Sequence, residues 1–172
     1  MATNVSNIKL KKSNVISAGV KTKCKRINVN DVPVWTGSED LLANAGITNL
    51  YASCTTPDSG VAEQYSATLS FNWDDIDTLT IKGYYSTLNY HGGDWHNRND
   101  FKIYILVNDI WQEIWSQQQN AFSGAWDINI TVDAESYTGE GAIRCYCSSY
   151  YLTDHSIKNG LSIEISSVVT NV

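Results

Sequence analysis

Apolar and polar residues alternate through most of residues 64–166, and this alternation restricts the chain to one class of fold. A two-residue period puts successive side chains on opposite faces of an extended strand, so one face can be buried while the other meets water. No 3.6-residue period, which a helix would need, is sustained in this region. The inward residues that the pattern predicts are, strand by strand, Tyr65, Ala67, Leu69, Phe71 and Trp73; Leu79, Ile81, Gly83 and Tyr85; Phe101, Ile103, Ile105 and Val107; Trp126, Ile128, Ile130 and Val132; Ile143, Cys145, Cys147, Ser149 and Tyr151; and Leu161, Ile163 and Ile165.

Polar turns join the strands, and two of these turns carry the same Asn-Asp pair. Residues 27–35 read INVNDVPVW, and residues 105–115 read ILVNDIWQEIW. Asn and Asp tolerate the left-handed backbone of tight turns, so both stretches predict β-hairpins. Repeated strands of this kind predict an all-β fold, an antiparallel β-sandwich.

One short helix is predicted ahead of the main strands. It opens near Ser38, has Glu39 and Asp40 in its first turn, continues with the apolar residues Leu41, Leu42 and Ala45, and stops at Gly46. Acidic residues in the first turn and glycine just past the end are typical helix boundaries.

The charge of the chain divides at the same place. Residues 1–36 hold seven Lys and Arg against one acidic residue, and residues 37–172 hold five against seventeen, so the net charges are +6 and −12. This division predicts a basic N-terminal β-hairpin unit, residues 1–36, and an acidic β-sandwich domain, residues 37–172. Two interpretations of the N-terminal lysines stay open: they form a solvated face of a small β unit, or they belong to a unit that docks to an acidic neighbour. Nucleic acid is not expected as a partner, because the acidic domain would repel phosphate.

Composition excludes two further classes of protein. Apolar residues make up 42% of the chain, with six Trp and ten Tyr, which is not the composition of a disordered protein. No run of about 18 apolar residues is present, so membrane insertion is not expected. The first fifteen residues lack the apolar segment of a secretory signal, so we expect synthesis in the cytosol.

The four cysteines are Cys24, Cys54, Cys145 and Cys147. The last two share one face of a predicted strand, where they are poorly placed to bond each other. Buried free thiols are the expectation for a protein made in the cytosol. A four-thiolate zinc site is the alternative, although Cys-x-Cys is not the usual spacing of a zinc knuckle.

The hairpin segment INVNDVPVW, which follows a basic strand, resembles the short β-hairpin near the N-terminus of many small tail and virion proteins of tailed bacteriophages and prophages. The stretches TLTIKGYY, FKIYILVNDIWQEIW and LSIEISSVV resemble the jelly-roll β-sandwiches that follow such units and that are similar to carbohydrate-binding modules. The resemblance implies a virion protein, assembled in the host cytoplasm, that docks through Lys25, Arg26 and Trp35. Its jelly-roll-like sandwich would face outward, toward a cell-surface glycan. The chain departs from the family at Asp31, where Gly is usual, and Pro33 makes the returning strand an edge strand.

A long polar loop, residues 89–100, is the candidate ligand site. It reads NYHGGDWHNRND and lies between two predicted strands. Sugar recognition needs a flat apolar ring to stack on, together with planar polar groups that bind hydroxyls. The candidate glycan-binding residues are Tyr90, His91, Asp94, Trp95, His96, Asn97 and Arg98. An ordinary polar loop whose Trp folds onto the core is the alternative, and His91, Asp94 and His96 match no strong metal motif.

Two further features leave alternatives open. The acidic turn of residues 73–77 has three aspartates that could hold a structural calcium ion or simply form a solvated turn, and no other cofactor is expected. Trp111, Glu113 and Trp115 alternate on one strand face, while Ile110 and Ile114 occupy the other. The two tryptophans would form a stacking platform if exposed and part of the core if buried. A strand with apolar residues on both faces predicts a central position or a subunit interface.

No catalytic motif stands out. The chain has no G-x-S-x-G elbow, no glycine-rich phosphate loop and no H-E-x-x-H pair, so an enzyme is not expected. The favoured hypothesis is a non-enzymatic virion protein, tail or capsid-associated. Its expected partners are other copies of itself, a trimer for example, together with other virion proteins and a cell-surface glycan. The alternatives are a free-standing carbohydrate-binding module and a cryptic glycan hydrolase.

Overall fold

The computed structural model describes residues 15–17, 20–22, 27–29, 32–35, 37–55, 60–88, 97–119, 123–151 and 160–171. Strands dominate these residues. Their bounds are β1 Val15–Ser17, β2 Val20–Thr22, β3 Ile27–Val29, β4 Val32–Trp35, β5 Ser38–Asp40, β6 Leu50–Thr55, β7 Gly60–Tyr65, β8 Leu69–Asn72, β9 Thr78–Leu88, β10 Asn97–Val107, β11 Ile110–Gln119, β12 Gly124–Asp133, β13 Glu140–Tyr151 and β14 Gly160–Asn171. One α-helix, α1, spans Leu41–Ala45, and a 3₁₀ helix, η2, spans Trp73–Asp75.

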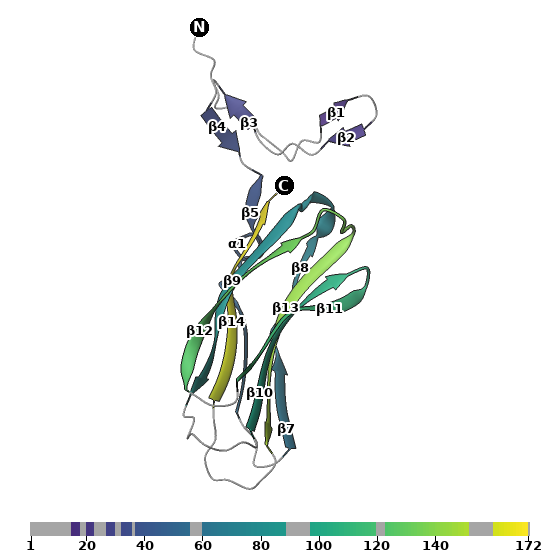
Figure 1. Cartoon of the computed structure of the whole chain (residues 1–172). Helices are drawn as coiled ribbons and strands as arrows, with labels where there is room; N and C mark the ends of the chain where they lie inside the picture. The colour runs from purple at the N-terminus through teal and green to yellow at the C-terminus, as the bar shows by residue number, and fades with distance from the viewer. Residues whose placement is uncertain are drawn as a thin grey trace.

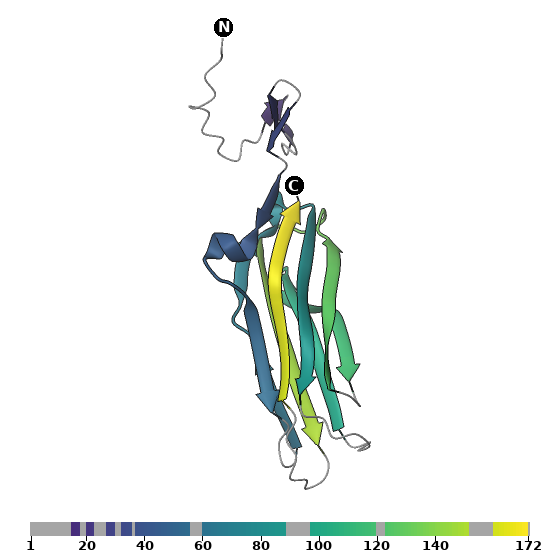
Figure 2. The same ribbon diagram turned by 90° about the vertical axis from the view of Figure 1, so that its left-hand side faces the viewer.

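Two antiparallel sheets form a β-sandwich, which confirms the predicted fold class. One sheet has the order β12-β9-β14-β6, with β5 also paired to β14. The other has the order β11-β10-β13-β7, with β8 also paired to β13. Numbered along the chain from β6 and without the short β8, the eight strands lie in the orders 1-8-3-6 and 2-7-4-5, which is the jelly-roll arrangement of two Greek keys. Figure 1 shows both sheets, and in Figure 2 the yellow β14 lies between β6 and β9.

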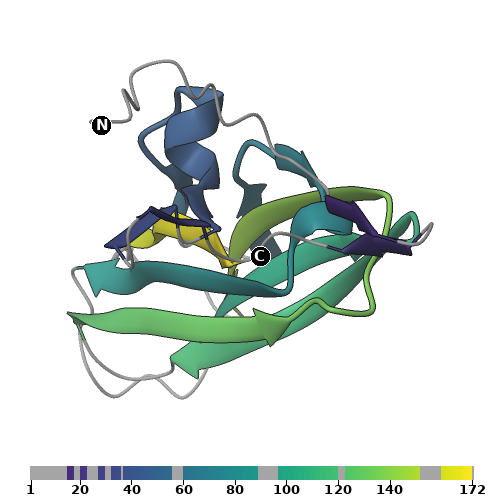
Figure 3. The same ribbon diagram turned by 90° about the horizontal axis from the view of Figure 1, so that it is seen from above.

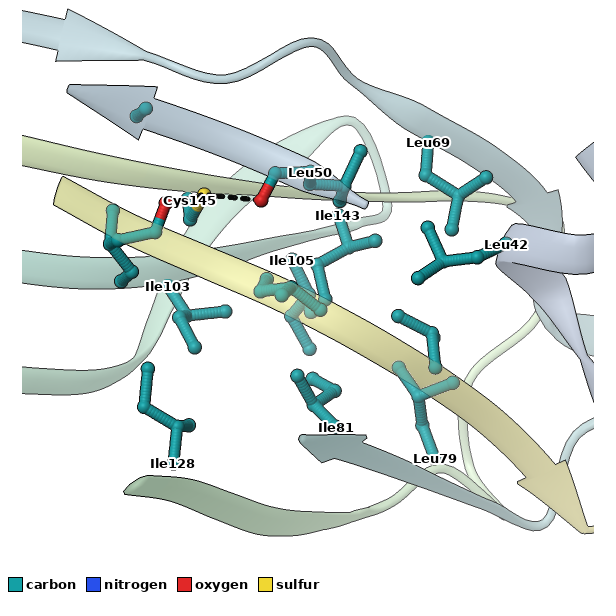
Figure 4. Close-up of a cluster of buried hydrophobic side chains, with 14 of the residues drawn as sticks. Leu42, Leu50, Leu69, Leu79, Ile81, Ile103, Ile105, Ile128, Ile143 and Cys145 are labelled. Carbon is teal, nitrogen blue, oxygen red and sulfur yellow. Dashed lines mark hydrogen bonds between the residues drawn. The ribbon is translucent and has the colours of Figure 1, made fainter. Parts of the chain in front are cut away.

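The core lies between the two sheets, on the faces that the alternation predicts. Leu79 and Ile81 of β9 point inward with Ile103 and Ile105 of β10, and all four side chains are fully buried. Figure 4 shows this cluster, in which the Cys145 thiol donates to the Leu50 carbonyl at 3.6 Å. Several inward residues of β12, β13 and β14 are buried as well, namely Ile128, Ile143, Cys147, Ser149, Leu161, Ile163 and Ile165.

Trp73 of η2 fills one end of this core and is also fully buried. Its indole Nε1 donates to the Leu106 carbonyl at 2.8 Å, so the polar atom of the ring is satisfied. Phe71 and Tyr137 pack edge-on against the ring. The turn between β8 and β9 is therefore held by an inward-pointing tryptophan.

The predicted helix is shorter than expected at its start. Residues Ser38–Asp40 form β5, which pairs with β14, and the helix begins at Leu41. Asp40 is its N-cap and accepts from the Leu42 and Ala43 amides, and Gly46 ends it in the left-handed conformation at φ 71°. The predicted stop at Gly46 is confirmed, whereas the predicted first turn is a strand because β14 offers it a pairing edge. Figure 3 shows α1 at the side of the sandwich.

Both predicted hairpins are present. Strands β3 and β4 pair antiparallel around residues 30–31, and β10 and β11 pair around Asn108 and Asp109. Asn108 and Asp109 have φ values of 51° and 61°, which is the left-handed backbone expected of them. Among the described strands, β1 pairs with β2 and β3 with β4 in sheets of their own. The division between residues 1–36 and 37–172 stays a prediction.

The strand predicted over residues 64–73 is wrong in one respect, because it is interrupted. Strands β7 and β8 both pair with β13, but Tyr65 is opposite Tyr146 and Leu69 is opposite Ile143. Three residues, 66–68, therefore face two on β13, and this extra residue reverses the side to which the preceding strand points. Tyr65 faces outward, while Leu69 and Trp73 face inward as predicted.

Among the described residues, no helix has the length and apolar character needed to cross a bilayer.

Candidate functional site

Most of the residues predicted to bind ligand or to dock lie outside the described residues. These are Tyr90, His91, Asp94, Trp95 and His96 of the loop, together with Lys25 and Arg26. Trp35 ends β4 and Asn97 begins β10, and their side chains also lie outside the description. Arg98 is exposed on β10 and pairs with Asp100 on the same strand, at 3.0 Å between Nε and Oδ2. The structure therefore leaves the loop site as a prediction.

The described residues hold a different candidate, on the outer face of the sheet β11-β10-β13-β7. We call it the aromatic surface, and it consists of Tyr65, Tyr104, Trp111, Arg144 and Tyr146. Each of the four strands contributes at least one of its side chains. Because the inward neighbours on β10 and β13 are buried in the core, the alternation directs Tyr104, Arg144 and Tyr146 outward.

Two local irregularities complete this surface. The extra residue at 66–68 turns Tyr65 outward, opposite Tyr146. On β11, Glu113 is opposite Tyr104 while Trp115 is opposite Ile103, so Ile114 is an extra residue. This β-bulge places Trp111 on the outer face and Trp115 on the inner one, where Trp115 packs at 5.5 Å from the Tyr85 ring.

The structure thus corrects the prediction that Trp111, Glu113 and Trp115 share a face. It also excludes a central position for their strand, because β11 is at the edge of its sheet. A subunit interface remains the open alternative.

The rings of the aromatic surface pack against one another and against a guanidinium. Tyr65 and Tyr146 have ring centroids 4.6 Å apart, and Tyr104 is 6.2 Å from Tyr65. The Arg144 Cζ atom lies 4.2 Å from the Tyr65 centroid and 4.0 Å from that of Trp111. A cation against two aromatic faces is favourable, and it fixes both rings in orientation.

Charged groups border the rings. The Tyr146 hydroxyl donates to Glu63 at 2.9 Å, and the Lys102 ammonium pairs with Glu113 at 2.8 Å. Burial raises the pKa of Tyr146 to about 12, so its hydroxyl stays protonated at neutral pH. The hydrogen bond from Lys102 lowers the pKa of Glu113, and the same bond raises the pKa of Lys102. The shifts favour the charged forms of Lys102 and Glu113, which form an ion pair at the border.

Arg144 has one unused polar atom. Its Nε is buried and makes no hydrogen bond within the described part of the chain. A buried donor without an acceptor is uncommon in folded proteins. The guanidinium is thus held by its contacts with the Tyr65 and Trp111 rings, and its Nε is covered by the surrounding side chains.

The outer face of the other sheet is more polar. Tyr84 donates to Glu164 at 2.9 Å, and Ser86 and Ser162 share a hydrogen bond at 2.8 Å. Tyr51 is exposed at 50% and is opposite Glu164 in the sheet register. Among the described residues, none of the paired aromatic rings lies on this face. This face therefore lacks the packed rings of the aromatic surface, and it serves below as the control face.

No metal centre is formed within the described ranges. No group of three or more His, Cys, Asp or Glu side chains there is arranged to hold a metal ion. In the acidic turn, Asp74 accepts from the Gly139 amide at 2.8 Å, while the Asp75 side chain lies outside the description. Calcium at this turn stays a prediction, and so does the zinc alternative, since Cys24 is also outside.

The sequence analysis placed the ligand site in a loop. Of the aromatic surface it considered only Trp111, as part of a strand pair that would be either a stacking platform or core. Tyr104 and Tyr146 occupy outward positions of two strands that the pattern predicts well. Aromatic residues at positions that should meet water were the available signal. Tyr65 carried no such signal, because the extra residue at 66–68 that turns it outward is not visible in the alternation.

Comparisons with known proteins give a likeness in fold only. No family model matches the chain, and no curated protein matches it. Among solved structures, a chain of infectious bursal disease virus, Gt strain, matches with a TM-score of 0.43 at 12% identity, over 92% of this chain and 37% of that one. A structure described as CBM4 matches with a TM-score of 0.38 at 17% identity, over 71% of each chain.

A tailspike protein 4 domain of bacteriophage CBA120 matches with a TM-score of 0.33 at 5% identity, over 73% of this chain and 19% of that one. The chain spans about a third of the length of the infectious bursal disease virus chains that it matches. At these scores, the jelly-roll assignment rests on the strand order of the chain itself.

Proposed function

We propose that this chain is a non-enzymatic virion protein whose β-sandwich binds glycan on the aromatic surface. The observation that carries the glycan part is the cluster of three tyrosines, one tryptophan and one arginine on the outer face of a single sheet. Such a face presents rings beside hydrogen-bonding groups, and the four strands hold it rigidly.

The chemistry of the surface suits carbohydrate. A sugar ring has apolar C–H faces that pack on aromatic rings and hydroxyls that need donors and acceptors. The tyrosines and Trp111 offer the rings, and Glu63, Glu113 and Lys102 offer charged partners at the border. Because Arg144 already orients two of the rings, less conformational entropy is lost when a ligand binds.

The border carboxylates favour binding over hydrolysis. A glycosidase needs one carboxyl group that stays protonated near neutral pH to act as the acid. The pKa of Glu113 is lowered by Lys102, which is the opposite direction, and Glu63 already accepts from Tyr146. The non-enzymatic part of the proposal rests on this reasoning.

The virion part of the proposal rests on the N-terminal residues. Their net charge of +6 is opposite to the −12 of residues 37–172, and the β3–β4 hairpin forms a sheet of its own. A small basic unit of this kind fits docking to an acidic neighbour. In this proposal, the N-terminal unit attaches the chain to the particle, and the sandwich presents the glycan site.

A contact between copies of this chain is the second candidate role for the aromatic surface. Aromatic residues and arginine are enriched where proteins meet, and β11 is at the edge of its sheet. Measurements on the same variants separate the two roles.

The test compares three single variants in a glycan array and then by titration calorimetry with the best oligosaccharide. We expect Tyr65→Ala and Trp111→Ala to weaken binding at least about tenfold, because each removes one stacking ring. Tyr84→Ala is the matched control, since Tyr84 is an exposed tyrosine on the other face, and we expect it to bind like the parent chain.

Equal affinities for all three variants would contradict glycan binding at this surface. Light scattering on the same samples tests the second role. An oligomer that dissociates in Trp111→Ala, with no glycan bound by the parent chain, would assign the surface to contact between copies. Melting temperatures close to that of the parent confirm that each variant is folded.

A further inference from the structure

Two cysteines from facing sheets meet inside the sandwich. Cys54 is on β6 and Cys147 is on β13, and their Sγ atoms are 3.6 Å apart. Both are free thiols in the structure, with Cys147 fully buried and Cys54 half-buried. Cys145, the remaining described cysteine, is directed instead to the Leu50 and Ile163 carbonyls, at 3.6 and 3.8 Å.

The backbone on either side of the pair is held in place by sheet pairing. Cys54 is opposite Leu161 of β14, and Cys147 is between Phe101 of β10 and Gln64 of β7. A disulfide has an S–S length of about 2.05 Å, so each sulfur would move by only about 0.8 Å. We expect rotation of the two side chains to supply most of this movement.

The two thiols differ in their readiness to react. Cys147 donates a hydrogen bond to the Cys54 sulfur, which lowers the pKa of Cys54. The same contact raises the pKa of Cys147, and burial raises the pKa of Cys145 to about 11. Thiolate is the reactive form, so Cys54, the more exposed of the three, is the expected first nucleophile.

We propose that Cys54 and Cys147 are a modification site, at which oxidation forms a disulfide that links the two sheets. The oxidant is a small-molecule disulfide of the glutathione class. The Cys54 thiolate attacks one of its sulfurs, forms a mixed disulfide and releases one glutathione thiolate. Cys147 then loses its proton to solvent and attacks the Cys54 sulfur, which releases the second glutathione thiolate. Two protein thiols are oxidised and one glutathione disulfide is reduced to two thiols.

The second step is helped by the first. The hydrogen bond with Cys54 is the largest cause of the raised pKa of Cys147, and burial and the charge of Cys54 add to it. Once Cys54 is in a mixed disulfide, its negative charge is gone, and Cys147 can lose its proton more easily.

This site would give the chain a reduced state with free thiols and an oxidised state with a disulfide, depending on the surroundings. In a reducing cytosol the thiols stay free, and in an oxidising exterior they are joined. The bond would connect residues 93 apart in sequence and two different sheets, so it should restrict the unfolded chain strongly. The inference does not depend on glycan binding.

The experiment uses the full chain with Cys24→Ser, which prevents that thiol from cross-linking two copies. The reduced protein is incubated with oxidised glutathione. Its intact mass is measured before alkylation, and its free thiols are then alkylated for peptide mapping. We expect a loss of about 2 Da, a Cys54–Cys147 linked peptide, and a rise in melting temperature of roughly 10 °C.

Matched variants identify the sulfur pair. In Cys54→Ser, the mass loss and the rise in melting temperature should both vanish, whereas Cys145→Ser should retain both. Alkylation of Cys54 and Cys147 after oxidation would overturn the proposal. A stable glutathione adduct on Cys54 that is not converted to the Cys54–Cys147 disulfide would overturn it as well. Such an adduct would show that Cys147 cannot reach the Cys54 sulfur.

Discussion

At Gly83, β9 meets β14 with no room for a side chain. A Cβ atom built there would lie 1.9 Å from the Glu164 carbonyl oxygen and 2.9 Å from the Ile165 Cα atom. Both neighbours are backbone atoms of β14, so they cannot rotate away as a flexible side chain could. Next to Gly83, β14 carries an extra residue, Ser166, in its register with β9. The glycine allows this close approach.

We therefore predict that Gly83→Ala lowers the free energy of unfolding by about 3 kcal/mol or more, since two paired strands must separate to accept the methyl group. Gly160→Ala is the matched control, because Gly160 is also in a strand and its nearest neighbour is 3.9 Å from the added Cβ. It should change the stability by less than about 1 kcal/mol. Urea denaturation measures the free energy of unfolding of both variants. Equal losses would show that the backbone contact at Gly83 is not the cause of the destabilisation.

The hairpin β10–β11 joins the strands that carry Tyr104 and Trp111. Its two turn residues, Asn108 and Asp109, both have a left-handed backbone, and both are exposed. Such two-residue turns match the twist of the flanking strands and are most stable with glycine at the second position. The turn thus fixes the register that leads into the β-bulge at Ile114.

We expect substitutions at Asp109 to change stability in opposite directions. Asp109→Gly should raise the free energy of unfolding by about 0.5–1 kcal/mol, because glycine adopts this backbone without strain. Asp109→Ala should lower it by about 1 kcal/mol, because alanine is disfavoured there and has no side-chain oxygen for local hydrogen bonds. Thermal denaturation followed by near-UV circular dichroism tests this, and a loss of stability in both variants would contradict the turn geometry.

The two β-bulges decide which aromatic residues reach the outer face. One extra residue at 66–68 turns Tyr65 outward, and one at Ile114 separates Trp111 from Trp115. Each reverses the alternation for the residues on one side of it. The proposed binding surface therefore depends on two irregularities in strand pairing, whereas the core residues follow the regular alternation.

The complete chain combines an acidic sandwich with a basic N-terminal segment. The two sheets of the sandwich use β5 to β14, and the described strands before residue 37 pair only with one another. Stability should therefore reside in the sandwich, and attachment in the segment ahead of it.

A fragment of residues 37–172 tests this division. We predict that its melting temperature stays within about 3 °C of the full chain and that it binds glycan equally well, because no sheet pairing of the sandwich is lost. Light scattering on the full chain and the fragment then shows whether residues 1–36 contribute to assembly. A fragment that is unfolded by circular dichroism would contradict the boundary between Trp35 and Ser38.

The sequence correctly predicts which face of a strand is buried wherever the strand is regular. The inward faces of β9, β10, β12, β13 and β14 follow from alternation, because burial of one face and hydration of the other act on each strand separately. The Asn-Asp turns and the stop at Gly46 also follow from the residues themselves, whose backbone preferences are local.

Contacts between distant segments decided the rest. Whether Tyr65 points inward or outward depends on how residues 66–68 match β13, which comes some 80 residues later in the chain. The pairing of Ser38–Asp40 with β14 replaced a helical turn, and the meeting of Cys54 with Cys147 required two sheets to face each other. A pattern of neighbouring residues encodes which side chains avoid water, but register, bulges and sheet packing are set by partners that the pattern does not contain.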